Sequence, residues 1–72
     1  MSWLSGPIIV PDGKGGTRAI TEVSNGYKEA AGTFLSEHDA GRLDETDPQL
    51  KRVLEFYGAS NIEALRVKLR GW

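Results

Sequence analysis

DPQLKRVLEFYGASNIEALRVKLRGW, residues 47–72, is the stretch that decides the fold, because it carries start and stop signals for two short helices. Asp47 supplies an N-cap side chain, and Pro48 follows at the first helical position, where its missing N–H is not needed. Gly58 stops the helix. A helix is therefore predicted over residues 48–57, with a buried stripe made of Leu50, Val53, Leu54 and Tyr57.

The second helix of this stretch begins at a capping box. In Ser60-Asn61-Ile62-Glu63 the Ser60 hydroxyl and the Glu63 carboxylate can each accept a hydrogen bond from a backbone N–H of the first turn. Apolar residues then recur with helical spacing at Ile62, Leu65 and Leu69. We expect a helix over residues 61–70 that packs on its neighbour.

A longer helical pattern precedes these two helices. Its apolar positions recur every three or four residues, at Ile20, Val23, Tyr27, Ala30, Ala31, Phe34 and Leu35. The spacing predicts a helix over residues 17–40, closed by Gly41. Asn25-Gly26 is a turn signal, so the prediction allows a break in this helix near residue 25.

The first sixteen residues have a different composition from the rest of the chain. Residues 1–16 contain two Pro and four Gly, which favours an extended arm over a helix. As an alternative, residues 8–10 pair with residues 17–23 in a hairpin. The fold class expected is mostly α, with about three helices in one small domain over residues 17–72 and the arm before it. The alternative is an α+β fold with an N-terminal β-hairpin.

Composition excludes several classes of protein. The chain has 72 residues, no Cys and one His, so we expect no disulfide, metal site or cofactor. A domain this short buries a small core and leaves little room for an enclosed active site. Its longest apolar run, residues 7–11, is too short to span a membrane. No charged segment followed by an apolar run precedes a cleavage site, so the chain is expected to be cytoplasmic, with no membrane partner.

Two segments resemble catalytic motifs without matching their spacing. Asp12-Gly13-Lys14-Gly15-Gly16-Thr17 has the composition of a phosphate-binding loop, but a Walker loop needs Lys directly before Ser or Thr. In Glu37-His38-Asp39 an imidazole lies between two carboxylates, but adjacent residues on a helix point about 100° apart. We therefore interpret the first segment as a turn and the second as a helix end, and we do not expect an enzyme.

Residues 50–69 resemble a helix-turn-helix, with Gly58 in the turn and Ala64 and Val67 where the second helix would pack on the first. Leu54 departs from the pattern because a small residue is usual at that position. Glu63 departs from it because its charge would repel phosphate. The resemblance implies DNA binding as an alternative function, with three candidate contacts: Asn61, Arg66 and Arg70.

More apolar side chains are present than three helical stripes need. They are Trp3, Leu4, Ile8, Ile9, Val10 and Phe56. These side chains either complete the core or form a protein interface, in which an aromatic anchor accompanies a strand-like arm. The function expected is therefore binding: a non-catalytic interaction or assembly module that acts as an accessory protein, an inhibitor or a structural subunit, of the kind that viruses encode. Its partner would be a larger protein or further copies of the same chain.

Overall fold

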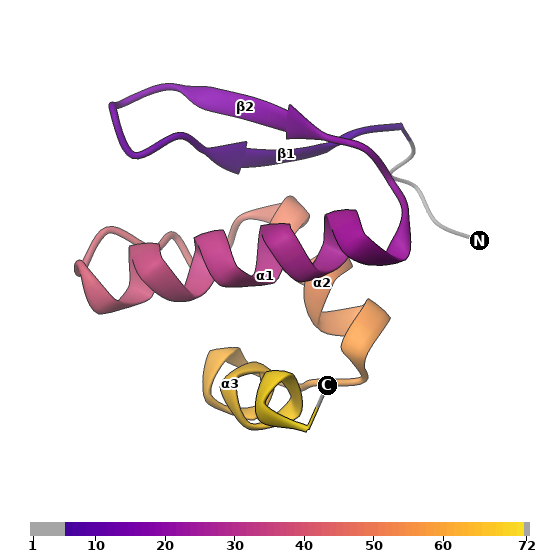
Figure 1. Cartoon of the computed structure of the whole chain (residues 1–72). Coiled ribbons are helices and arrows are strands. Elements are labelled where there is room, and N and C mark those ends of the chain that lie inside the picture. The colour runs from indigo at the N-terminus through magenta and orange to yellow at the C-terminus, as the bar shows by residue number, and fades with distance from the viewer. Residues whose placement is uncertain (1–5, 72) are drawn as a thin grey trace.

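The structure is a computed structural model and describes residues 6–71. Its elements, in chain order, are β1 (Ile8–Pro11), β2 (Thr17–Ile20), α1 (Ser24–Asp39), α2 (Pro48–Tyr57) and α3 (Ile62–Arg70). Helix α1 is central, because the hairpin covers one side of it and α3 lies on the opposite side, while α2 contacts both helices and β1 (Figure 1). The three expected helices are confirmed, and the hairpin of the α+β alternative accompanies them.

The hairpin corrects the expectation for residues 17–23. These residues were expected to begin the first helix, but 17–20 form β2, which pairs antiparallel with β1 and places Ile8 opposite Ile20. Residues 8–11, expected within the extended arm, are one strand of this pair. Pairing puts Ile8, Val10 and Ile20 on the face that packs against α1, where each is at most 5% exposed. If residues 17–23 were helical, Ile8 and Val10 would lack the paired strand and the Ile20 side chain beside them, and less apolar surface would be buried.

The glycine-rich segment is the turn of the hairpin. The Asp12 N–H donates to the Gly16 carbonyl at 3.1 Å, and the Asp12 carboxylate accepts from the amides of Lys14 at 2.7 Å and Gly16 at 3.0 Å. These two backbone hydrogen bonds lower the pKa of Asp12. Gly13 and Gly15 have φ angles of 80° and 86°, a left-handed conformation that Gly adopts readily. The interpretation as a turn is confirmed.

The position near residue 25 at which a break was allowed is the beginning of α1. Val23 is extended and makes no side-chain cap, and Asn25-Gly26 lies in the first turn of the helix. The chain folds back so tightly here that a Cβ on Gly26 would lie 1.9 Å from the Thr21 carbonyl oxygen. Gly26 therefore permits the close approach of β2 and α1 and does not interrupt a longer helix.

The helix ends largely follow the local signals. Gly41 and Gly58 are left-handed after α1 and α2, and the Asp47 carboxylate accepts from the Gln49 N–H at 2.9 Å. The cap of α3 is corrected by one residue. Asn61 caps this helix, accepting from the Ala64 N–H at 2.8 Å, where Ser60 was expected to do so. Asn is as good an N-cap residue as Ser, so composition alone does not choose between them.

The core is small and is completed by a buried arginine. Its apolar members are Ile8, Val10, Ile20, Ala30, Ala31, Phe34, Leu50, Val53, Tyr57, Ile62 and Leu65. The Arg52 guanidinium donates to backbone carbonyls at both Gly6 and Pro7 and pairs with Glu22 at 2.6 Å. It thereby holds the segment before β1 and the segment after β2 against α2. Within residues 6–71, no helix is long and apolar enough to cross a membrane.

Candidate protein-binding surface

A pair of stacked aromatic rings joins α1 to α2 at the surface. The rings of Tyr27 and Phe56 lie 4.1 Å apart between centroids and are inclined by only 3°. Phe56 and Tyr57 form a T-shaped pair, with a centroid distance of 5.0 Å and an angle of 81° between the rings. Tyr57 is buried, which raises its pKa, whereas Phe56 is 40% exposed. The stack therefore fixes the Phe56 ring and leaves part of it accessible.

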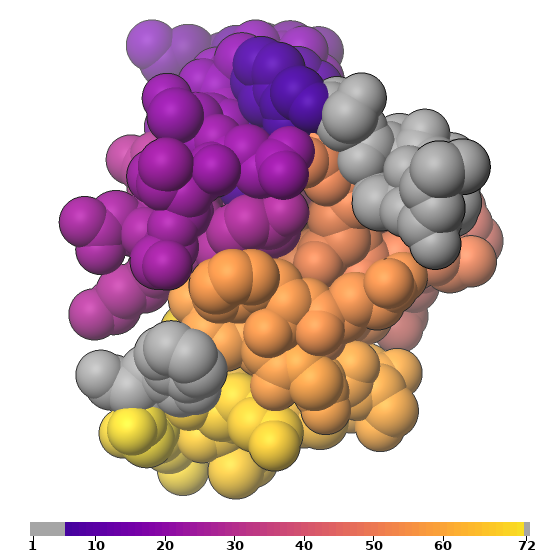
Figure 2. All heavy atoms as spheres, turned by 90° about the vertical axis from the view of Figure 1, so that its right-hand side faces the viewer, coloured from indigo at the N-terminus to yellow at the C-terminus, as the bar shows by residue number. Residues whose placement is uncertain are grey.

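Val23, the N-cap residue of α1, is a further exposed apolar residue. The Tyr27 N–H donates to the Val23 carbonyl at 2.9 Å, so the two residues are one helical turn apart, and Val23 is 52% exposed. Figure 2 shows the beginning of α1 and the chain of α2 side by side on one face, in agreement with the contact between Tyr27 and Phe56. We call Val23, Tyr27 and Phe56 the aromatic surface.

The expected interface residues separate into three groups. Ile8 and Val10 are fully buried in the core beneath the hairpin. Ile9 is 37% exposed on the opposite face of β1, and Phe56 belongs to the aromatic surface. Trp3 and Leu4 lie outside the described residues. Two of the expected contacts thus hold the fold together, and two are accessible on the surface.

The expected DNA contacts are distributed differently from a helix-turn-helix. Asn61 uses its side chain to cap α3, and Arg66 is bonded to Asp39 of α1 at 2.6 Å, a bond that holds the pKa of the Asp39 carboxyl below its usual value. Arg70 is exposed. Val67, which a helix-turn-helix would pack on the first helix, is 66% exposed, because α3 turns Ile62, Leu65 and Leu69 toward the core instead.

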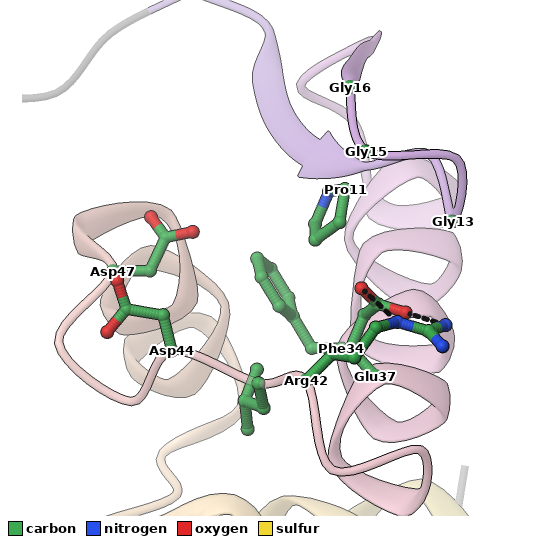
Figure 3. Close-up of a pocket in the computed structure, with 10 residues that line it drawn as sticks. Pro11, Gly13, Gly15, Gly16, Phe34, Glu37, Arg42, Asp44 and Asp47 are labelled. Carbon is green, nitrogen blue, oxygen red and sulfur yellow. Dashed lines mark hydrogen bonds and ion pairs between the residues drawn. The ribbon is translucent and has the colours of Figure 1, made fainter.

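A pocket of about 320 Å³ lies between the hairpin turn and the linker that follows α1. In the middle of the pocket, the Phe34 ring points toward Pro11. The Glu37–Arg42 pair lies on one side of this ring and Asp47 on the other (Figure 3). Leu43 and the turn glycines complete the lining. The pocket therefore has an apolar floor and a polar rim.

The polar groups of this rim already have partners. Glu37 is buried and pairs with Arg42 at 2.7 Å, which raises the pKa of the Arg42 guanidinium. Asp47 caps α2, and Asp44 accepts from the hydroxyl and the amide of Thr46, which lowers the pKa of Asp44. These carboxylates stabilise loops and helix ends, so the pocket is better described as a structural junction than as a reaction site.

The acidic and imidazole groups near the end of α1 point to different partners. Glu37 binds Arg42, Asp39 binds Arg66, and His38 lies 3.8 Å from Asp39 and 4.0 Å from Glu63. Both His38 distances are too long for hydrogen bonds, and its Nδ1 has no hydrogen-bond partner among the described residues. Within residues 6–71, no three His, Asp or Glu side chains lie together so as to hold a metal ion.

Sequence reasoning missed the features that depend on contacts between distant residues. Tyr27 was expected on the apolar face of the first helix, and its stack on Phe56 has no local signal in the sequence. The same is true of Arg52, whose four acceptors come from three separate segments. The position of Phe56 off the apolar face of its helix was evident from the sequence, but whether the residue is buried or exposed was left open. The chain matches no protein-family model, no curated protein and no solved structure.

Proposed function

We propose that this chain is a non-catalytic module that binds a larger protein through its aromatic surface. The observation that carries the proposal is the exposed ring of Phe56, which is 40% accessible although it is stacked on Tyr27. Aromatic side chains are enriched among the residues that dominate protein interfaces. A ring already held by a stack loses little conformational freedom when a partner covers it, so more of the contact energy remains for binding.

The surroundings of Phe56 support the same function. Val23 adds an exposed apolar side chain one turn before Tyr27, which is stacked on Phe56 of α2. The aromatic surface carries no charged side chain of its own. An accessory protein, an inhibitor and a structural subunit would each use such a surface in the same way, by covering part of a larger protein.

The test begins with a photoreactive phenylalanine analogue at position 56, used in the cell that produces the chain. The crosslinked protein is identified and purified, and its affinity for the chain is measured by calorimetry. Phe56→Ala is expected to weaken this affinity by about thirtyfold, as loss of a central aromatic contact does. Val67→Ala is the matched control, because Val67 is exposed but lies on α3.

Three results would oppose the proposal. Equal affinities for the Phe56 and Val67 variants would place the contact elsewhere. If Phe56→Ala loses binding and is also unfolded, Phe56 has a structural role. Circular dichroism of the variant detects the unfolding. Tight binding of a mixed-sequence DNA duplex that weakens steeply with salt and is lost in Arg70→Gln would favour the helix-turn-helix alternative.

A further inference from the structure

The hydrogen-bond pattern of the hairpin shows which backbone groups face away from it. The Asp12 N–H donates to the Gly16 carbonyl, so this pair and every second pair beyond it are hydrogen-bonded pairs: Val10 with Arg18 and Ile8 with Ile20. The pairs between them, Ile9 with Ala19 and Pro11 with Thr17, direct their N–H and C=O groups outward. The outer edge of β2 thus presents the backbone of Thr17 and Ala19.

The two outer edges differ in how they are protected. On β1, the Ile9 N–H donates to the Gln49 side chain of α2 at 3.3 Å, and Pro11 has no N–H to offer. On β2, the residues from Thr17 to Ala19 are all exposed, and within residues 6–71 no acceptor is present for the outward amides of Thr17 and Ala19. β2 also has neither Pro nor a bulge, two devices that usually block strand addition.

We infer that the outer edge of β2 binds an extended segment of another protein, which adds a third strand to the hairpin. The N–H and C=O groups of Thr17 and Ala19 would form the main-chain hydrogen bonds. Small side chains on the outer face, Thr17 and Ala19 themselves, leave room for the side chains of the incoming strand. The inference concerns a surface separate from the aromatic surface and does not depend on the function proposed above.

Charge selects the kind of segment. Arg18 points to the α1 face of the hairpin, where it lies 3.5 Å from Glu29 and donates to the Thr33 hydroxyl at 3.1 Å, and its side chain remains 44% exposed. Lys14 in the turn is also exposed. A residue opposite Arg18 on an added strand would share its face, so a Glu or Asp there would be attracted to the guanidinium.

The same charge disfavours a second copy of the chain as the occupant. The antiparallel self-pairing that uses the outward groups of both Thr17 and Ala19 places Arg18 directly opposite its equivalent in the other copy. Like charges in that position destabilise a strand pair. A register shifted by two residues toward Thr21 would need the Thr21 carbonyl as an acceptor. This carbonyl already accepts from the Val23 N–H.

The experiment uses the full chain and a panel of seven-residue peptides in which Thr and Val alternate and the central residue is Glu, Gln or Lys. Binding is followed by fluorescence anisotropy and by amide hydrogen exchange. The Glu peptide is expected to slow exchange at Thr17 and Ala19, whose amides exchange fast in the protein alone. It should bind about tenfold more tightly than the Lys peptide, because only the Glu peptide pairs with Arg18.

Two variants test the edge and the charge separately. Ala19→Pro removes an outward N–H without removing a ladder hydrogen bond, as Pro11 does on β1, so it should abolish peptide binding while leaving the circular dichroism spectrum unchanged. Arg18→Glu should reverse the preference, so that the Lys peptide binds best. This second variant keeps the inference testable if Ala19→Pro does not fold.

Other results would overturn the inference. One is that no peptide in the panel alters exchange at Thr17 and Ala19, and another is that peptides protect amides elsewhere. A dimer in sedimentation experiments, with these two amides protected before any peptide is added, would make a second copy the occupant. Because none of these readouts involves Phe56, failure here and failure of the proposed function can be distinguished.

Discussion

At the scale of single residues, the clearest departure from a simple apolar core is Arg52. Its side chain is only 6% exposed, and its donors reach two backbone carbonyls, Gln49 and Glu22. Burying a charge is costly unless it is paired and hydrogen-bonded, and here both conditions hold. Arg18 is the useful contrast, because it pairs with Glu29 at 3.5 Å but is 44% exposed.

These two arginines should respond differently to the same substitution. We expect Arg52→Met to lower the free energy of unfolding by about 2–3 kcal/mol, because it removes four part-buried hydrogen bonds, including those to the carbonyls of Gly6 and Pro7. Arg18→Met should cost less than about 1 kcal/mol, since exposed ion pairs contribute little. Urea unfolding followed by circular dichroism measures both. Equal losses would show that Arg52 acts only as another surface charge.

The Asp39 carboxylate predicts a dependence on acid. The hydrogen bond from Arg66 holds its pKa below the usual 3.8. A carboxyl whose pKa is lowered by folding contributes stability that is present above its unfolded pKa and is lost as the pH falls through its folded value. The natural protein should therefore be more stable than Asp39→Asn at neutral pH. This difference in the free energy of unfolding should disappear below about pH 4. A stability difference that stays constant down to about pH 2 would contradict this. The stability difference between the natural protein and Arg66→Gln should disappear over the same pH range.

At the scale of elements, two glycines of α1 have opposite roles. A Cβ on Gly26 would lie 1.9 Å from the Thr21 carbonyl oxygen, whereas a Cβ on Gly32 would meet nothing within 4 Å. We expect Gly26→Ala to destabilise the protein by about 1–3 kcal/mol through overpacking. Gly32→Ala should stabilise it by about 1 kcal/mol, because Ala is the better helix former. Thermal unfolding of the two variants should shift in opposite directions, and a shift to higher temperature in both would show that the contact at Gly26 relaxes easily.

Helices α2 and α1 show which element boundaries could be predicted from the sequence and which could not. The bounds of α2 followed from Asp47, Pro48 and Gly58, because capping is a matter of neighbouring residues. The start of α1 did not, because Ile20, Val23 and Tyr27 have helical spacing although Ile20 lies on a strand. What decides between helix and strand there is the burial of Ile20 beside Ile8, a contact between residues far apart in the chain.

The candidate surfaces divide in the same way. Phe56 could be identified from sequence, because it falls off the apolar face of a well-bounded helix. The open edge of β2 could not, since it depends on the register of the hairpin and on Gln49 covering the edge of β1. Features set by local spacing were therefore accessible from sequence, whereas those set by pairing required the fold.

At the scale of the whole molecule, the hairpin is expected to be essential for folding. Ile8 and Val10 are fully buried against α1, and burial of two such side chains contributes about 3–6 kcal/mol. A domain of this size rarely has a greater margin of stability than that. The fragment 17–72, which matches the helical domain expected from sequence, should therefore fail to fold, giving a poorly dispersed amide NMR spectrum and no cooperative unfolding transition.

Point substitutions in the full chain separate loss of the core from loss of length. Ile8→Ala should lower the free energy of unfolding by about 2–4 kcal/mol, because it opens a cavity beneath the hairpin. Ile9→Ala removes the same atoms from the neighbouring residue, which is 37% exposed, and should cost less than about 1 kcal/mol. If the fragment 17–72 unfolds cooperatively and the two variants are equally stable, the helices are a domain of their own and the hairpin is an appendage. If only Ile8→Ala is damaging and the fragment is unfolded, the hairpin and the three helices form one cooperative unit, and an added strand at β2 would stabilise the whole chain rather than the hairpin alone.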